Sequence, residues 1–317
     1  MQPKYSIIIP AYNEQEVLGE SYKRIKAVME TLDGPYEMIF VDDGSRDDTL
    51  KLLTEMAEQN ECVKVLSFSR NFGHQIAVSA GLDNASGRAI IIIDCDLQDP
   101  PEVIPEMVKK WKEGYDVVYG KRLKRAGESI FKRITAKVYY RVLKMMSASK
   151  IPLDTGDFRL IDKKVRDAIC AMPEKSRFLR GMVSWAGFKQ TPVEYMRDAR
   201  WAGETKYPLS KMIKLAGDGI TSFSSKPLGI ATKVGIGLCF LTALYAVVSL
   251  ILAWCGVLIT PWIAYVFAAL GFLIGLISVF IGILGIYIGR IFDEAKSRPL
   301  YFIGQKINFE KEEKDDR

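Results

Sequence analysis

Short runs of apolar residues alternate with amphipathic segments along the first part of the chain. The runs are rich in β-branched residues and predict buried strands at residues 5–9, 38–41, 63–67, 89–93 and 117–119. Apolar residues recur at helical spacing in the intervening segments 14–32, 48–59, 74–84 and 101–112. Continuous apolar strands separated by such helices indicate an α/β domain with a mainly parallel sheet covered on both faces.

The hydrophobic pattern changes near the carboxyl terminus. The chain carries 44 Lys and Arg and 38 Asp and Glu, yet no Asp, Glu, Lys, Arg or His occurs from Val234 to Gly289. A membrane-crossing helix needs about 20 apolar residues, so this length predicts two spans, at 234–255 and 262–289, joined near Thr260-Pro261. Because neither span contains an ionisable residue, we expect an anchor rather than an ion pathway.

Basic residues flank the apolar region on both sides, at Lys226, Lys233, Arg290, Lys296 and Arg298. By the positive-inside rule both termini are cytoplasmic. The first apolar run, residues 7–9, is too short for a cleavable signal, and the five cysteines lack C-x-x-C spacing. We therefore expect an inner-membrane protein with two spans, whose soluble part lies in the reducing cytoplasm.

Polar residues cluster where each of the first four predicted strands ends, at 12–14, 42–45, 69–73 and 94–99. The carboxyl ends of parallel strands meet at one sheet edge, where open α/β sheets bind ligands. Asp94 and Asp96 lie two residues apart, so an extended segment places both carboxylates on one face, where they can bind a divalent cation and a diphosphate. The alternative is a solvated acidic turn closed by Pro100-Pro101, and we interpret Asp99 as a turn residue.

Other residues at this edge suit a nucleotide. Tyr12 can stack on a base, and Asp42 or Asp43 can accept hydrogen bonds from a base or a ribose. The chain has neither G-x-G-x-x-G after the first strand nor G-x-x-x-x-G-K-[ST] anywhere. Dinucleotide oxidoreductases and P-loop enzymes are therefore disfavoured. The single histidine, His74, cannot form a metal cluster, and we expect a structural or polar-contact role for it.

Five motifs together carry a family resemblance: IPAYNE at 9–14, VDDGS at 41–45, SRNFG at 69–73, DCDLQDPPE at 94–102 and TGDFRL at 155–160. The set resembles family 2 glycosyltransferases with a GT-A fold. Within that family it is most similar to the polyprenyl-phosphate glycosyltransferases, which include bactoprenol glucosyltransferase and dolichol-phosphate mannose synthase. The resemblance extends over nearly the whole chain, including the two predicted spans.

The resemblance implies a role for each matching residue. The nucleotide would be bound by Pro10, Tyr12, Glu14, Asp43 and Asp94. Mg²⁺ or Mn²⁺ would be held by Asp94, Asp96 and Gln98. Asp96 and Asp157 would be the catalytic carboxylates, with Asp157 beside the acceptor. Phosphate groups of the donor and acceptor would be bound by Arg122, Arg200 and Lys206. Arg125 lies with Arg122 in a basic cluster at 120–125, which could bind the polyprenyl phosphate or could be a basic surface attracted to anionic lipid.

The chemistry supports the proposed base role of Asp157 only weakly. A phosphate monoester has a second pKa near 6 and is already largely dianionic at neutral pH. A general base is then hardly required, and Asp157 would orient the acceptor or shield the anomeric carbon. The alternative is that Asp157 serves as a helix cap or as the ion-pair partner of Arg159.

We expect four regions along the chain. A cytosolic GT-A catalytic domain covers 1–207 and includes an amphipathic interfacial helix near 129–147. An amphipathic juxtamembrane segment covers 208–232, a transmembrane hairpin 233–290 and a cytosolic tail 291–317, which ends in a charged segment expected to be disordered. The two amphipathic segments could instead be ordinary core helices.

The leading hypothesis is an inverting transfer of a hexose, glucose from UDP-glucose, to a polyprenyl (undecaprenyl) phosphate at the cytoplasmic membrane face. GDP-mannose, UDP-N-acetylglucosamine and UDP-aminoarabinose remain alternative donors, because sugar discrimination depends on a few contacts. A processive polysaccharide synthase is disfavoured, because Arg197 stands where the Q-x-x-R-W pattern requires Gln. A non-catalytic nucleotide-sugar scaffold is a further alternative. We expect a homo-oligomer and no nucleic-acid partner.

Overall fold

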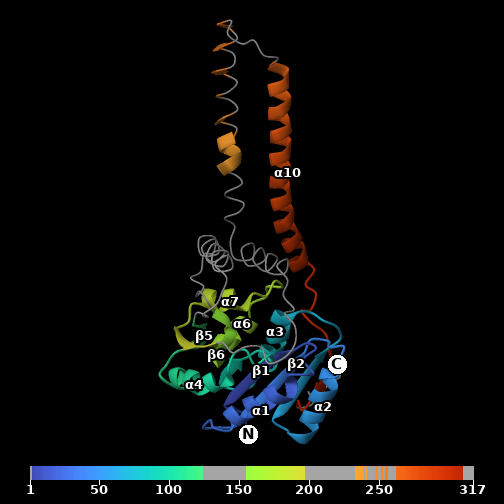
Figure 1. Cartoon of the computed structure of the whole chain (residues 1–317), viewed down its shortest axis with the longest axis vertical. Coiled ribbons are helices and arrows are strands. Elements are labelled where there is room, and N and C mark those ends of the chain that lie inside the picture. Colours follow the sequence, from blue (N-terminus) through green and yellow to red (C-terminus); the bar gives the residue numbers. More distant parts are fainter. Residues whose placement is uncertain are drawn as a thin grey trace, which may run out of the picture.

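The computed structural model describes residues 2–123, 155–196 and 262–309, together with scattered residues of 233–255. The predicted interfacial helix near 129–147, the juxtamembrane segment 208–232 and the charged end 310–317 lie outside the described residues. So do Arg125, Arg200 and Lys206. The described part consists of an α/β domain and a long helix that projects from it (Figure 1).

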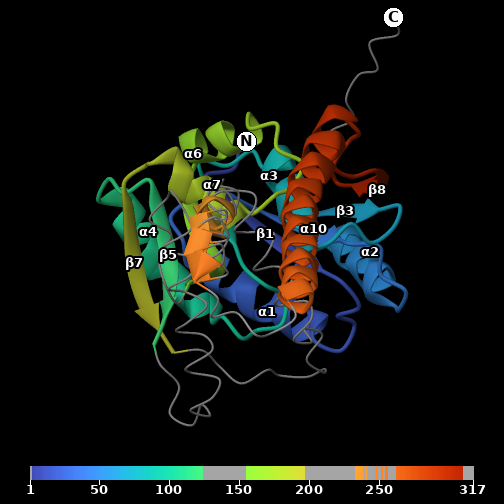
Figure 2. The same cartoon turned by 90° about the horizontal axis from the view of Figure 1, so that it is seen from above.

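The domain is built on one eight-stranded sheet with the order β7-β5-β6-β4-β1-β2-β3-β8. The strands are β1 (Tyr5–Ala11), β2 (Tyr36–Asp42), β3 (Val63–Phe68), β4 (Ala89–Ile92), β5 (Val117–Arg122), β6 (Thr155–Asp162), β7 (Gln190–Tyr195) and β8 (Ile303–Ile307). All of them run in one direction except β6 and β8, which pair antiparallel with their neighbours. β7 and β8 lie at opposite edges (Figure 2).

Helices cover both faces of the sheet. They are α1 (Leu18–Met29), α2 (Thr49–Gln59), α3 (His74–Asn84), the 3₁₀ turn η1 (Pro101–Val103), α4 (Ile104–Lys112), α6 (Lys163–Cys170) and α7 (Leu179–Ala186). The projecting helix is α10 (Trp262–Ala295). Alternation along β1 explains the two layers, because Ile7 and Ile9 pack in the core with α1, α2 and α4, whereas Ile8 packs with α3, α6 and α7. Figure 1 shows α3, α6 and α7 on the face nearer to α10.

The α/β prediction with a mainly parallel sheet is confirmed, and α3 has the predicted bounds. The sequence pattern did not predict β6, β7 or β8. β8 belongs to the segment expected to be a tail, and it pairs with β3 at the edge of the sheet. The carboxyl-terminal segment is therefore part of the domain as far as residue 309.

The helix α10 has 34 residues. Within the described residues it contains the one stretch that is long and apolar enough to cross a membrane, Phe272–Ala295. The first predicted span, 234–255, is described at scattered positions only, and these are helical as far as Trp254. Gly235 in that segment lies against α10, since a Cβ atom there would come within 3.2 Å of the Phe280 ring.

The second predicted span contains two G-x-x-x-G patterns, Gly271 to Gly275 and Gly285 to Gly289. Gly275, Gly285 and Gly289 have no neighbouring atoms within 4 Å of a Cβ position. Within the part of the chain that is described, these glycines therefore do not mediate close helix contacts. Small residues allow helices to approach only where they face another helix. Here Gly235 fits that role instead.

Candidate functional site

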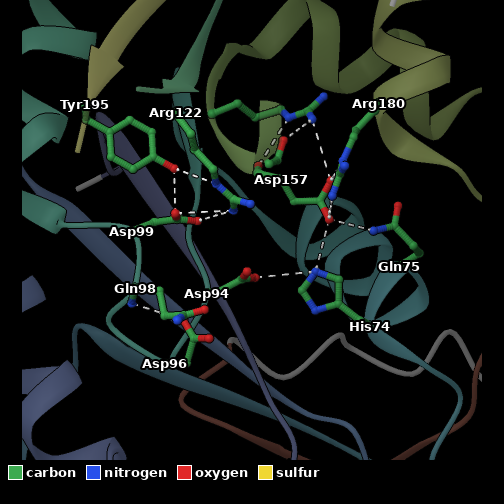
Figure 3. A network of polar contacts seen from close by, with 12 residues as sticks. His74, Gln75, Asp94, Asp96, Gln98, Asp99, Arg122, Asp157, Arg180 and Tyr195 are labelled. Carbon is green, nitrogen blue, oxygen red and sulfur yellow. Dashed lines mark hydrogen bonds and ion pairs between the residues drawn. The ribbon is translucent and has the colours of Figure 1, made fainter. Parts of the chain in front are cut away.

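The polar residues gather where the order of the sheet reverses. β1 lies between β2 and β4, with which it pairs in parallel, and the crossover connections diverge from it to the two sides. Open α/β sheets bind ligands outside the carboxyl ends of the strands at such a point. Figure 3 shows the polar network at this edge, with side chains from α3, the segment after β4, β5, β6 and α7.

The acidic segment after β4 alternates between buried and partly exposed residues. Cys95, Leu97 and Asp99 are buried, whereas Asp94, Asp96 and Gln98 remain partly exposed. The segment is held by the Gln98 backbone N–H, which donates to Asp96 Oδ1 (3.1 Å), and by Leu97, whose φ is 56°. Asp94, Asp96 and Gln98 therefore lie on one side, as predicted for the two aspartates. A solvated acidic turn does not fit this burial pattern.

Asp94 lies opposite His74, the first residue of α3. His74 Nε2 is 3.5 Å from Asp94 Oδ1 and 3.4 Å from Asp157 Oδ2. Burial alone would lower the pKa of His74, but Asp94 and Asp157 raise it to about 9. Burial and the nearby carboxylates raise the pKa of Asp94 to about 6, although His74 opposes that shift. The expected polar-contact role of His74 is confirmed.

Asp157, on β6, is 7% exposed and has several cationic and polar partners. Arg180 donates from Nε to Oδ1 (2.8 Å), and Gln75 donates from Nε2 to Oδ2 (2.9 Å). Arg159 Nη2 lies 3.6 Å from Oδ1, so the ion pair named as an alternative is present. Burial would raise the pKa of Asp157, but Arg180 and His74 hold it well below its usual range. A carboxylate with so low a proton affinity is a poor general base.

Asp99 lies in the bend before Pro100, as interpreted from the sequence, but it is not solvated. Its side chain is fully buried, accepts a hydrogen bond from Tyr195 Oη (2.5 Å) and pairs with Arg122 Nη2 (3.1 Å). Arg122 also lies against Gly156, where a Cβ atom would come within 2.4 Å of Nη2. Arg122 therefore joins β5, β6, β7 and the acidic segment, and it remains partly exposed at the edge of the site.

The nucleotide residues predicted from the first two strands lie at the adjoining part of the edge. Pro10 is buried in β1, and Tyr12 and Glu14 follow it partly exposed. Asp43 accepts hydrogen bonds from the backbone N–H of Phe72 (2.7 Å) and of Gly73 (2.9 Å). Burial raises the pKa of Asp43, and these amides oppose the shift. The carboxylate thus holds the loop between β3 and α3.

The same region contains a close backbone crossing. Gly44 has a φ of 68°, and a Cβ atom there would lie 2.5 Å from the backbone carbon of Arg70. Asn13 Oδ1 accepts from the Arg46 N–H (2.8 Å), and Thr49 Oγ1 accepts from the Glu14 N–H (2.9 Å). The three loops after β1, β2 and β3 are therefore fixed to one another.

The donor set suits a divalent cation that is shared with a ligand. No group of three His, Cys, Asp or Glu side chains among the described residues is arranged to hold a metal ion alone. Asp94 and Asp96 supply carboxylates and Gln98 an amide, and Asp94 Oδ1 is a buried oxygen without a hydrogen-bond partner. Mg²⁺ commonly takes one or two carboxylates together with substrate phosphate oxygens and water. The residues therefore fit a cation bound jointly with a diphosphate.

Three members of the network were not predicted: Gln75, Arg180 and Tyr195. Gln75 follows His74 directly after the SRNFG motif, so the motif indicated that Gln75 would lie near the site. Arg180 and Tyr195 lie 23 and 96 residues from the carboxylates that they contact. Neither stands in a motif, and only the pairing of β5 with β6 and β7 brings them to the site.

A mainly parallel sheet with an acidic segment at its switch point defines an α/β protein that binds ligands at the carboxyl edge of its strands. The chain belongs to glycosyl transferase family 2, whose family model matches residues 6–170. The matched region includes β1 to β6 and the residues of the acidic segment. The family resemblance drawn from the motifs is therefore confirmed.

Curated relatives match over almost their full length. An uncharacterized glycosyltransferase of Bacillus subtilis, YkcC, is 51% identical over 97% of this chain and 95% of its own. The prophage bactoprenol glucosyl transferase homolog of Escherichia coli is 40% identical, covering 95% of this chain and 98% of its own. The bactoprenol glucosyl transferase of Shigella phage SfII is 40% identical, covering 95% and 97%.

Among solved structures, glucosyl-3-phosphoglycerate synthase from Mycobacterium tuberculosis in complex with UDP matches with 18% identity and a TM-score of 0.48. The match covers 69% of this chain and 78% of that one. The same enzyme in complex with Mn²⁺, UDP-glucose and phosphoglyceric acid matches with the same identity and TM-score.

Proposed function

We propose that the protein is an inverting glycosyltransferase that moves glucose from UDP-glucose to a polyprenyl (undecaprenyl) phosphate at the cytoplasmic face of the inner membrane. Its product would be a lipid-linked sugar for cell-envelope glycosylation. The proposal rests on the acidic segment at the switch point, where the buried Asp94 Oδ1 faces His74 at 3.5 Å and has no hydrogen-bond partner, in a chain that also carries an apolar helix. Relatives named bactoprenol glucosyl transferase support the choice of glucose and of the lipid acceptor.

The donor would bind along the edge formed by the loops after β1, β2 and β4. Tyr12 would stack on the base, and Pro10, Glu14 and Asp94 would line the nucleotide path. Asp43 would support nucleotide binding indirectly, because its carboxylate accepts hydrogen bonds from the loop between β3 and α3 and so holds that loop in place. Mg²⁺ or Mn²⁺ would be held by Asp94, Asp96 and Gln98, where it would supply Lewis-acid neutralisation of the departing diphosphate.

Transfer forms one bond and breaks one. An oxygen of the acceptor phosphate attacks the anomeric carbon from the face opposite the diphosphate, whose bond to that carbon breaks and which leaves as UDP. The acceptor is already dianionic at neutral pH, so no proton has to be removed. Asp157, held ionised by Arg180 and His74, positions these cations beside the acceptor rather than acting as a base.

The acceptor phosphate would meet several cations. Arg122 lies at the edge of the site, with Asp99 and Tyr195 holding its guanidinium. Arg125, Arg200 and Lys206 complete the phosphate-binding set proposed from the family resemblance. Guanidinium groups suit this role because they bind phosphate oxygens in a bidentate manner. We further propose a two-span membrane protein with both termini in the cytoplasm, assembled as a homo-oligomer.

The test is a transfer assay with full-length protein, UDP-[¹⁴C]glucose and undecaprenyl phosphate, with mass spectrometry of the lipid product. Activity should require added Mg²⁺ or Mn²⁺ and disappear with EDTA. Asp96→Ala should lose more than about 100-fold in kcat, because removing one transition-state electrostatic contact typically has that effect. Glu58→Ala, an exposed acid on α2, is the matched control and should keep full activity. Metal-independent transfer, or full activity in Asp96→Ala, would refute the proposal.

The assay also separates the alternatives. A panel of UDP-glucose, UDP-N-acetylglucosamine, GDP-mannose and UDP-aminoarabinose identifies the donor by competition and by product mass. Tight UDP-sugar binding without transfer to any acceptor would indicate a scaffold. A product with many sugars per lipid would indicate a processive synthase.

A further inference from the structure

Residues at the starts of two helices, α3 and α7, hold the carboxylate of Asp157. Gln75, at the start of α3, donates to Oδ2 (2.9 Å), and Arg180, at the start of α7, donates to Oδ1 (2.8 Å). Gln75 also accepts a hydrogen bond at Oε1 from the Leu179 N–H (3.1 Å), which joins the two helix starts. The position of Asp157 therefore depends on the loops that precede α3 and α7.

The loop before α7 is bonded to the end of α10. The Lys175 backbone N–H donates to Glu294 Oε1 (2.7 Å), and Arg290 Nη1 donates to Ser176 Oγ (3.0 Å). An open pocket of about 460 Å³ lies at this junction and is lined by residues of both segments, including Lys175, Ser176, Arg290 and Glu294.

The loop before α3 is bonded to the chain that leaves α10. The Ser69 N–H donates to the carbonyl oxygen of Phe302 (3.0 Å), and the ring of Tyr301 stacks on that of Phe68 at 5.1 Å. β8 then continues along β3 in antiparallel pairing. The loop that begins at Ser69 runs directly into His74 and Gln75, so it links this edge of the sheet to Asp157.

We propose that Arg290, Glu294, Tyr301 and Phe302, the exit residues of α10, are positioning residues for the active-site carboxylate Asp157. Both loops that hold Asp157 are bonded to the chain within a few residues of the end of the apolar helix. The seating of that helix in the membrane is thereby coupled to the acceptor side of the site. The tests of this inference that measure kcat rest on the proposed transferase function.

The first test uses full-length protein in lipid vesicles and the UDP-glucose transfer assay. Glu294→Ala removes the acceptor for Lys175 N–H and should lower kcat about tenfold, since small displacements of a positioned group have effects of this order or larger. Glu294→Gln keeps an oxygen acceptor and should restore most of the rate. KM for UDP-glucose should stay within about twofold in both, because the donor loops are untouched. Asp293→Ala removes the same charge one residue away, where the side chain pairs, among the described residues, with Lys296 within α10, and should match the parent protein.

The second test concerns the contact between Tyr301 and the strand that leads into the loop before α3. Tyr301→Ala removes the ring that stacks on Phe68 and should lower kcat in the same way, whereas Tyr301→Phe keeps the ring and should retain most of the rate. Gln305→Ala, at an exposed position of β8, is the matched control. Thermal unfolding of each variant shows whether a loss of rate reflects a loss of folded protein. Equal losses of kcat in Glu294→Ala and Glu294→Gln, or a normal kcat in both alanine variants, would overturn the inference.

Hydrogen–deuterium exchange gives a readout that does not depend on the reaction. Residues 173–181 should exchange faster in Glu294→Ala and residues 69–77 faster in Tyr301→Ala, with the control variants unchanged. Unchanged exchange in both loops would contradict the positioning role. If the parent protein transfers no sugar while exchange responds as expected, the proposed function fails and the structural coupling stands.

Discussion

Asp157 is surrounded by more positive charge than one carboxylate can neutralise. Arg159, Arg180 and protonated His74 all lie within ion-pair distance of its oxygens. Burial lowers the pKa of Arg159 to about 10, even though Asp157 opposes that shift, and the group still remains charged at neutral pH. Asp94 shares the charge of His74, and the three cations still exceed the two carboxylates, which favours an anionic acceptor beside Asp157.

This arrangement gives a prediction for Asp157→Asn. Asparagine keeps the shape but cannot hold Arg180 by a charged bidentate contact, so kcat should fall about 100-fold. The acid limb of the pH profile should not move, because the pKa of Asp157 lies well below the assay range. That limb should follow the acceptor phosphate, whose second pKa is near 6, together with Asp94, whose pKa is raised to about 6, with activity rising as pH increases through this range. A variant whose acid limb disappears would show that Asp157 is the titrating base.

Arg122 has a structural partner in addition to its proposed phosphate. Its guanidinium pairs with Asp99, which is fully buried. Arg122→Ala should therefore destabilise the protein by about 3 kcal/mol, because it leaves a buried carboxylate without its counter-ion. Thermal unfolding should show partial recovery in the double variant Arg122→Ala/Asp99→Asn. If the double variant recovers stability and remains inactive, Arg122 also contacts substrate; if stability does not recover, the ion pair is not the cause of the loss.

At the level of the elements, Glu37 joins three parts of the sheet. It lies on β2, pairs with Lys64 on β3 (2.7 Å) and accepts hydrogen bonds from Ser6 on β1 and from the Ser86 N–H before β4. Burial alone would raise the pKa of Glu37, but Lys64, Ser6 and Ser86 lower it below its usual value. A carboxylate with a lowered folded-state pKa stabilises the fold fully above its unfolded pKa, about 4.3.

Glu37→Gln should therefore lower the free energy of unfolding at pH 7 by about 1–3 kcal/mol, the range for a broken buried hydrogen-bonding group. The difference between parent and variant should shrink as pH falls below about 4, because Glu37 is protonated as pH falls through its lowered folded-state pKa. Thermal unfolding from pH 7 to pH 3 measures this. A difference that stays constant across the range would mean that the charge of Glu37 contributes nothing.

The elements also show which parts of the fold were predictable. Each of β1 to β5 contains a short apolar run, and its length and β-branched residues favour a buried strand over a helix. β6 was missed because Asp157 and Arg159 interrupt its apolar residues, and both charged groups are buried by pairing with each other and with Arg180. β8 has too few apolar residues to stand out, since its pairing with β3 at the edge leaves it partly exposed.

The site was predictable to a similar extent. Asp94 and Asp96 follow a strand and repeat at strand spacing, which placed them on one side of the segment. Asp99 has the same sequence context, and nothing local distinguishes a ligand-facing carboxylate from one buried against Arg122 and Tyr195. Such pairs depend on strand order, and a single sequence does not display strand order.

For the whole molecule, the pairing of β3 with β8 limits how the chain can cross a membrane. β3 precedes the apolar region and β8 follows it, yet the two strands share one sheet. The intervening chain must therefore cross an even number of times. If α10 crosses once, a second crossing must lie between residue 196 and the start of α10, as proposed for 234–255. At roughly 1.5 Å per residue, α10 is about 50 Å long, so it can pass through a core of about 30 Å and still reach the domain.

Cysteine labelling tests this topology. In a background whose five native cysteines are replaced by Ala or Ser, we expect Thr260→Cys, in the predicted turn, to react in intact cells with a membrane-impermeant maleimide. Ser297→Cys, exposed just after α10, should react only after the cells are permeabilised. The cysteine-free parent is the control and should not be labelled. Labelling of Ser297→Cys from outside would place the whole sheet, with its acidic segment, on the side that lacks cytoplasmic nucleotide sugars, and the proposed reaction could not then take place there.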